Sequence, residues 1–395
     1  MAMHIGRTLP PAAAPLHFKD IISGWAGLFE GVITVRRFEE ELKEVYGVRH
    51  CFAVSSGKAA LVLILQALNE LSPERDEVLI PAYTCYSVPS AIVRAGLKVR
   101  LCDLASGTLD FDFDRLEEQL ENPRILCVIP THLFGLPADA ERVKRLADHR
   151  GIFVVEDAAQ AMGAEWNGKK MGTVGDVGLF SMGRGKAFST VEGGIILTDN
   201  DLIGRAIEKR LGAIAGYGAF DCLKLILYAV ALSLLIHPWI YWLPKSLPFL
   251  KLGETHFNPS FPIRRLSSFQ AGAAKGWKNK IGELREIRSK NAVKIAGYGI
   301  TPPAVLKDVL PGLIRYPVLL ADVDAKKKIL RISERMGLGI SGGYPDSIDG
   351  ISELGNLSDG NGFPGAKDIA ERMVSLPVHP FVSESDLQKI GQLLI

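Results

Sequence analysis

Cysteine is scarce in this 395-residue chain, and its five cysteines are scattered without a C-x-x-C pair. An odd number at these spacings argues against a disulfide framework and a structural zinc site, and it is typical of a reducing compartment. Cys51, Cys102 and Cys127 lie inside apolar runs and are predicted to be small core residues. Net charge is also small, at +2, and so gives no indication of a nucleic-acid partner. We therefore expect no metal site and no nucleic-acid binding.

A run of membrane-spanning length is absent as well. The most apolar segment has a charge-free core at 225–236, a dozen residues, whereas a spanning helix needs about 20. Aromatic residues follow it near Lys245, which leaves three interpretations of 223–250: a peripheral membrane contact, a helix buried at a subunit interface, or a lid over the substrate. Residues 1–18 have no continuous apolar core and do not predict a secretory signal. We expect a cytoplasmic protein, located at the inner face of the membrane under the first interpretation.

The arrangement of apolar runs predicts an α/β fold. Between residues 50 and 155 short apolar runs alternate with amphipathic helices, which indicates a mainly parallel sheet covered on both faces. The predicted strands are 50–54, 77–81, 99–103, 125–130, 152–155, 177–182 and 193–198, and one long helix is predicted over 268–296. The length predicts one very large domain or two. The predicted division is an N-terminal strap (1–35), a large domain (36–215), an apolar insert (216–262) and a smaller C-terminal α/β domain (263–395).

The strongest chemical pattern lies between residues 152 and 198. The apolar run Ile152–Val155 is followed by Glu156-Asp157, at the strand end where ligands bind in open parallel sheets. The next run contains Ser181 and leads into a glycine-rich turn that ends at Lys186. An acid facing a pyridine nitrogen keeps that ring protonated, a lysine amine forms an imine with an aldehyde, and hydroxyl and amide donors hold a phosphate. Pyridoxal 5′-phosphate (PLP) needs all three groups.

This segment resembles the DegT/StrS family of sugar aminotransferases, a branch of the fold-type I PLP enzymes. The matching residues are Glu156–Gln160, Gly175–Gly178, Phe180-Ser181, Lys186 and Glu192–Gly194. The resemblance implies a three-layer fold-type I architecture with PLP as cofactor. It implies that Lys186 is the catalytic, imine-forming residue, that Asp157 pairs with the pyridinium nitrogen, that Gln160 approaches the ring hydroxyl and that Ser181 binds the phosphate. It also implies a homodimer, because the family's sites form between two subunits.

Two positions near the expected phosphate depart from the family. Gly57-Lys58 opens a helix after a strand, which is an anion site, and the family has Gly-Thr there. The backbone donors remain, and Lys58 either pairs with the phosphate or points to solvent.

Ile263 stands where the family has an asparagine that reaches the phosphate of the neighbouring subunit. Because a guanidinium binds phosphate well, Arg265 is assigned to the cofactor, with Arg264 and Asn258 as alternatives.

The ring-stacking position is a further departure, since the family typically has an aromatic residue where Cys85 stands. Tyr86 or Tyr83 takes its place, or the cofactor ring rests on the Cys85 thiol. His132 follows a strand and matches a family turn near the site, and it is either structural or a substrate contact. Tyr344, in the polar loop 344–365, is the other predicted substrate contact.

The resemblance implies transamination from glutamate to the keto group of a nucleotide-linked deoxysugar, in polysaccharide or glycoconjugate biosynthesis. Three alternatives stay open. A sugar dehydratase on this fold is disfavoured by Lys186, since relatives of that type carry histidine there. An aminotransferase for a cyclitol or a lipid-linked ketone keeps the chemistry and changes the acceptor. A non-catalytic regulatory protein keeps the fold alone.

Overall fold

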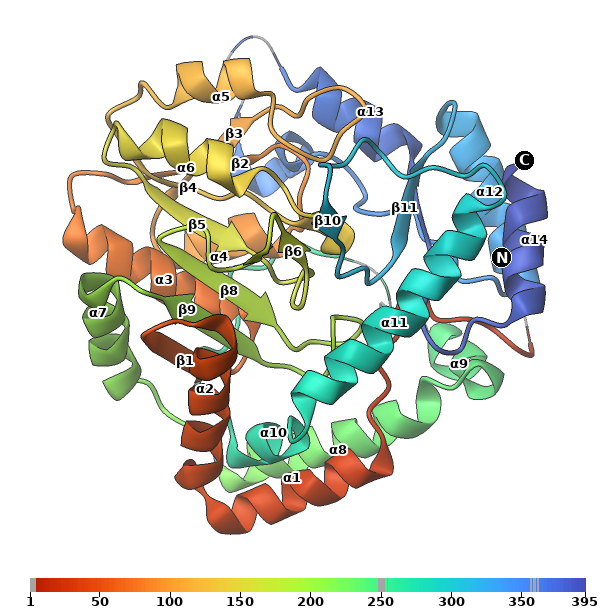
Figure 1. The fold of residues 1–395 in the computed structure, drawn as a ribbon, viewed down its shortest axis with the longest axis horizontal. Helices are drawn as coiled ribbons and strands as arrows, with labels where there is room; N and C mark the ends of the chain where they lie inside the picture. Colours follow the sequence, from red (N-terminus) through yellow and green to blue (C-terminus); the bar gives the residue numbers. More distant parts are fainter. Residues whose placement is uncertain (1–4, 248–252, 254, 356, 358–359, 361) are drawn as a thin grey trace.

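A seven-stranded sheet forms the centre of the computed structural model, which describes residues 5–247, 253, 255–355, 357, 360 and 362–395 (Figure 1). Its spatial order is β1-β9-β8-β5-β4-β2-β3. The strands are β1 (His50–Val54), β2 (Glu77–Pro81), β3 (Lys98–Cys102), β4 (Ile125–Val128), β5 (Phe153–Asp157), β8 (Val177–Ser181) and β9 (Gly194–Thr198). Neighbouring strands from β3 to β8 run parallel, and β9 runs antiparallel to its neighbours β1 and β8. The predicted α/β fold with a mainly parallel sheet is confirmed.

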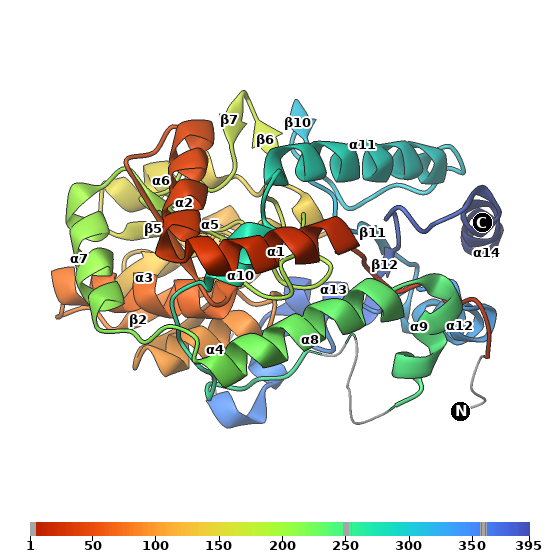
Figure 2. The same cartoon turned by 90° about the horizontal axis from the view of Figure 1, so that it is seen from below.

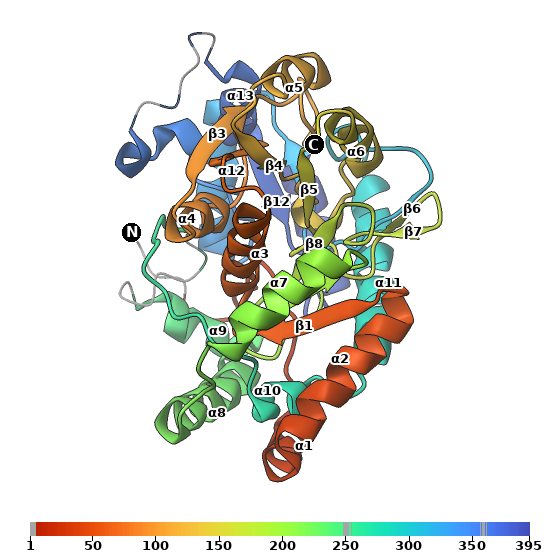
Figure 3. The same cartoon turned by 90° about the vertical axis from the view of Figure 1, so that its left-hand side faces the viewer.

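Helices cover both faces of the sheet and make three layers. On one face lie α3 (Gly57–Leu71), α4 (Ser87–Arg94) and α7 (Asp201–Gly212), with α3 and α7 side by side (Figure 3). On the other lie α2 (Val32–Tyr46), α5 (Phe113–Gln119) and α6 (Ala140–Asp148). Because successive strand residues point to opposite faces, Val78 and Ile80 pack with α3 and α4, and Leu79 packs with α5 and α6.

The N-terminal region differs from the predicted strap, because residues 18–30 form the helix α1 (Phe18–Glu30). α1 packs on α10 (Ser268–Ala273) through glycines, and a Cβ added at Gly27 would lie only 2.4 Å from the Ser268 carbonyl oxygen. The prolines at the start of the chain favoured a strap, although Phe18, Ile21, Ile22, Trp25, Leu28 and Phe29 follow helical spacing. The predicted strap thus contains a helix over Phe18–Glu30.

The predicted long helix over 268–296 is two helices. α10 ends at Ala273, and α11 (Trp277–Ala296) begins after Gly276, whose φ of 73° is left-handed. Glycine adopts this conformation without steric cost, which explains the break.

Beyond α11 the chain forms a small unit with its own core. β11 (Tyr316–Leu319) pairs antiparallel with β12 (Met373–Leu376), and α12 (Val323–Met336), α13 (Pro364–Arg372) and α14 (Glu384–Leu394) accompany them. A separate three-stranded sheet joins β10 (Val309–Leu310) to β6 (Glu165–Trp166) and β7 (Lys169–Lys170). The predicted loop 344–365 contains two short 3-10 turns, Ile348–Gly350 and Ser352–Leu354.

The apolar insert folds as two helices, α8 (Ala219–Leu235) and α9 (Pro238–Lys245). α8 lies beside α1 along one edge of the molecule (Figure 2). Residues 248–250, the end of the predicted segment, lie outside the described residues. Among the residues described, no helix is both long enough and apolar enough to cross a membrane.

Candidate active site

A cavity of about 620 Å³, the site cavity, opens where β1, β5 and β8 end. Its volume is in the range of small-molecule sites, and it lies at the strand ends where α/β sheets bind ligands. The predicted residues that line it are Gly57, Lys58, Cys85, Asp157, Gln160, Ser181 and Lys186. The other four predicted residues, Tyr86, His132, Arg265 and Tyr344, are not part of its lining.

Asp157 ends β5 and is 7% exposed. Its Oδ1 accepts a hydrogen bond from the Ala159 amide at 3.0 Å. Burial raises the pKa of this carboxyl, and the Ala159 amide, Lys186 and His132 offset that effect only in part. A positive charge facing the carboxylate from the cavity would stabilise its ionised form. A protonated pyridine nitrogen is a group of that kind.

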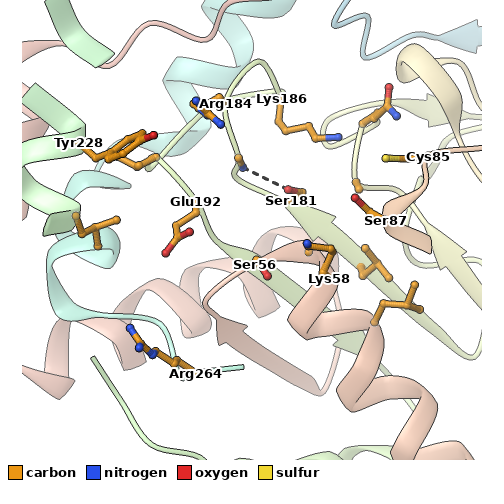
Figure 4. Close-up of a pocket in the computed structure, with 18 of the residues that line it drawn as sticks. Ser56, Lys58, Cys85, Ser87, Ser181, Arg184, Lys186, Glu192, Tyr228 and Arg264 are labelled. Carbon is orange, nitrogen blue, oxygen red and sulfur yellow. Dashed lines mark hydrogen bonds between the residues drawn. The ribbon is translucent and has the colours of Figure 1, made fainter. Parts of the chain in front are cut away.

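Lys186 lies in the loop after β8, and Figure 4 shows its side chain extending across the cavity toward Cys85. Burial lowers the pKa of its ammonium group, Cys85 and Asp157 act in the opposite direction, and Arg315 lowers it further. A lowered pKa increases the fraction of neutral amine, which is the form that attacks a carbonyl carbon. The geometry therefore suits an imine-forming lysine.

The N-terminus of α3 and the end of β8 form a cradle beside Lys186. The first amides of a helix have no intrahelical acceptor, and the helix dipole is positive there, so this end attracts an anion. Ser56 caps the helix by accepting a hydrogen bond from the Ala59 amide. A Cβ at Gly57 would lie 3.0 Å from Ser181 Cβ, so glycine keeps the space between α3 and β8 open. The cradle fits a phosphate.

Gln160 joins the cavity to the C-terminal unit. Its Oε1 accepts a hydrogen bond from the Phe134 amide at 3.1 Å, and its Nε2 donates one to Tyr344 Oη at 2.7 Å. The Tyr344 amide in turn donates to Tyr83 Oη at 3.2 Å. Tyr344 thus contacts the site through Gln160 and holds that amide in one orientation.

The acid, the lysine and the anion cradle agree with a match to a known family. Residues 23–213 match the model of the DegT/DnrJ/EryC1/StrS aminotransferase family. This part of the chain, just under half of its length, is similar to that family.

Individual relatives extend the comparison. The L-glutamine:2-deoxy-scyllo-inosose aminotransferase of Streptomyces kanamyceticus is 36% identical over 187 residues, 47% of this chain and 43% of that protein. GDP-perosamine synthase of Vibrio cholerae is 32% identical over 201 residues, 50% of this chain and 53% of that protein. The matches thus span about half the length of these relatives. The Helicobacter pylori aminotransferase PseC, involved in pseudoaminic acid biosynthesis, has a TM-score of 0.79 at 20% identity, covering 98% of both chains. That likeness concerns the fold.

Lys58, which replaces the threonine of the DegT/StrS pattern, is held inside the site cavity. Its Nζ lies 4.3 Å from the centroid of the Phe261 ring, a cation–π distance. Burial lowers the pKa of this ammonium. This position favours the pairing of Lys58 with a phosphate over the alternative that it points to solvent, and the pairing stays a prediction.

Of the three proposed stacking residues, the structure brings only Cys85 to the cavity. Tyr83 is fully buried, and its hydroxyl is the acceptor for Tyr344. Tyr86 precedes α4, is 8% exposed, and directs its hydroxyl at the Asp346 carbonyl oxygen. Tyr86 is thus corrected to a packing residue, because the helix start turns it into the core.

His132 is structural. Its Nδ1 accepts a hydrogen bond from the Ala138 amide at 2.9 Å, so Nε2 carries the proton and donates to Glu156 Oε1 at 3.0 Å. The Glu156 carboxylate also accepts the amides of Gly172, Val174 and Gly175. Burial opposes ionisation of Glu156, but these bonds together lower its pKa. With both ring nitrogens engaged, His132 is not available to a substrate.

Arg264 rather than Arg265 lines this chain's cavity. Arg264 forms an ion pair with Asp221 at 3.0 Å, and its guanidinium lies 5.2 Å from the Tyr217 ring centroid. Arg265 is exposed, and its amide bonds to the Ala215 carbonyl oxygen. Arg265 thus does not line this chain's own cavity, and its predicted contact with the cofactor phosphate of the neighbouring subunit stays a prediction.

Sequence reasoning missed a group of cavity residues on the apolar insert. α8 contributes Asp221, Lys224, Leu225 and Tyr228 to the lining. Tyr228 also lies under the Arg184 guanidinium, 5.9 Å from ring centroid to Cζ. The polar residues at the start of α8 could have indicated that the insert contributes to the cavity, but the interpretation was based on the apolar run that follows them. These contacts favour the lid interpretation of the insert.

Proposed function

We propose that this protein is a PLP-dependent aminotransferase that moves an amino group from a donor, glutamate being the expected one, to the keto group of a carbohydrate. One observation carries the proposal: the site cavity brings together the Lys186 amine, the buried Asp157 carboxylate and the anion cradle of α3 and Ser181. These are the three groups that PLP requires, and they come from three different elements.

PLP, when bound, supplies an aldehyde carbon and a ring that accepts electrons. Lys186 would hold that carbon through Nζ and, when its amine is free, would accept and return the proton that moves during transfer. Asp157 presents a desolvated carboxylate to the ring nitrogen and keeps it protonated. Ser181 and the first amides of α3 hold the phosphate, and Gln160, fixed by Phe134 and Tyr344, orients the ring hydroxyl. α8, which lines the cavity, would limit the access of water to it.

The acceptor we propose is a keto sugar of surface-polysaccharide or glycoconjugate biosynthesis. The Vibrio relative is named for a GDP-linked sugar and the Streptomyces relative for a cyclitol, and these names support a nucleotide-linked deoxysugar or a related ring ketone. Glutamate remains the expected donor, with glutamine as the comparison because the Streptomyces relative is named for it. We also propose that the protein acts in the cytoplasm as a homodimer.

The test is chemical trapping of the lysine. Holoenzyme reduced with borohydride and digested should yield a pyridoxyl-labelled peptide that contains Lys186. The Lys186→Arg variant should lose the label, while Lys278→Arg, a change on exposed α11 surface, should keep it. A label on another lysine, or none on reconstituted protein, would refute the proposal. Addition of glutamate should bleach the cofactor's absorbance, and a non-catalytic regulator would leave it unchanged.

A further inference from the structure

A second cavity adjoins the site cavity and has a different character. Its volume is about 420 Å³, and Arg184 and Tyr228 line both cavities. Its walls come from α8, α9 and the N-terminal segment, and the apolar ones that matter here are Pro11, Ala231, Leu232, Leu235, Ile236 and Pro244. Among the described residues that line it, only two arginines and two tyrosines carry polar side-chain atoms. We call it the apolar cavity.

Arg315 lies where the apolar cavity meets the site. It lines the apolar cavity, and it is near enough to Cys85, Tyr344 and Lys186 to interact with them electrostatically. Its Nε atom is buried and has no hydrogen-bond partner. No ion pair joins Arg315 to a carboxylate in the part of the chain that the structure describes. A buried guanidinium without an anion is costly, so this position calls for an anionic ligand.

The two cavities differ in polarity and share Arg184. Lys186 lines the site cavity, Arg184 lines both cavities, and Arg315 lines the apolar cavity together with its apolar walls. A nucleoside in the apolar cavity would leave most of its base and ribose hydrogen-bonding groups unpaired, which costs affinity. An apolar chain loses nothing there and gains by leaving water.

We propose that the acceptor is an anionic amphiphile: a keto sugar joined through phosphate to a lipid, with its chain in the apolar cavity and its phosphate between Arg184 and Arg315. This proposal rests on the transamination proposed above and specifies its substrate class. The outer surface of α8 and α9 supports a lipid substrate because it exposes large apolar side chains. These are Leu227 (60% exposed), Leu234 (59%), Trp239 (63%), Ile240 (41%) and Leu243 (44%). A chain longer than the cavity would continue over this surface.

The binding test uses farnesyl phosphate, with farnesol, inorganic phosphate and UDP as comparisons, titrated into holoenzyme by calorimetry. Farnesyl phosphate should bind at least about tenfold more tightly than each of the other three, because only it satisfies both the arginines and the apolar walls. Tighter binding of UDP, or equal binding of farnesol, would overturn the proposal.

Two variants locate the site. Leu232→Trp fills the apolar cavity and should weaken farnesyl phosphate binding about tenfold or more, whereas Val293→Trp, a matched change on exposed α11 surface, should not. Arg315→Gln should weaken farnesyl phosphate binding and leave farnesol binding unchanged. If Arg315→Gln instead slows bleaching by glutamate and leaves farnesyl phosphate binding intact, the arginine serves the donor carboxylate and the proposal is wrong. Bleaching by glutamate and trapping of Lys186 test transamination separately, so failure of the lipid proposal leaves that result standing.

Discussion

Asp157→Asn tests the electrostatics of the site most directly. The amide keeps the size of the side chain and its hydrogen bond from the Ala159 amide, but it removes the charge that faces the ring nitrogen. Asp157 is 7% exposed, so water cannot replace that charge, and removing one partner of a buried pair costs about 3–5 kcal/mol. Each increase of about 1.36 kcal/mol in the activation free energy slows a reaction tenfold. If the full cost raises the transition state, the rate therefore drops by about two to four orders of magnitude.

The assay is the single-turnover rate of bleaching by glutamate, followed at the cofactor's absorbance maximum. Asp110→Asn is the matched control, because Asp110 is a partly buried aspartate whose pKa is also raised by desolvation, and it lies outside the site cavity. The control should stay within about threefold of wild type. An Asp157→Asn rate within the same range, on protein that retains PLP, would refute the assigned role of the carboxylate.

Three further predictions concern stability, cofactor retention and pH. Glu156→Gln should lower the free energy of unfolding by about 3 kcal/mol in urea titrations, since the buried carboxylate accepts four hydrogen bonds. Because folding lowers the pKa of Glu156, the ionised carboxylate stabilises the protein at neutral pH, and this stabilisation is lost as the pH falls through the folded-state pKa. The free energy of unfolding of the variant should therefore decrease less steeply at acid pH than that of wild type. Gly57→Ala should weaken PLP retention on dialysis about tenfold, because its Cβ would press on Ser181, while Gly282→Ala, which meets no neighbouring atom, should not. The lowered pKa of Lys186 predicts that the rate at which apoprotein couples with PLP reaches its plateau at a lower pH than the coupling of an exposed lysine amine; a plateau reached only at the pH of an ordinary lysine would contradict it.

The apolar insert shows how a local pattern leaves function undecided. Its composition fits a membrane-surface anchor, an interface helix and a lid equally, because each needs one apolar face. In the structure α8 lines both cavities, which favours the lid. The membrane and interface interpretations stay predictions, and the farnesyl phosphate titration bears on the first of them.

The predicted elements differ from the structure in two places. The strands of the central sheet were predicted to within a few residues, because buried parallel strands are short, apolar and bounded by turns. The helix α1 was missed, and α10 and α11 were merged. The merging of α10 and α11 involves Gly276, whose left-handed φ no periodicity reveals. In α1 the apolar residues follow helical spacing, but the prolines that precede the helix outweighed that pattern.

The sequence alone determined the alternation of strands and helices and the order of Asp157, Ser181 and Lys186, since each follows from residues close together in the chain. Tertiary structure decided which side chains face the ligand. It turned Tyr86 into the core, engaged both nitrogens of His132 and brought Arg315 from the C-terminal unit to the edge of the site. These outcomes depend on contacts between segments far apart in sequence, and such contacts leave no local pattern to read.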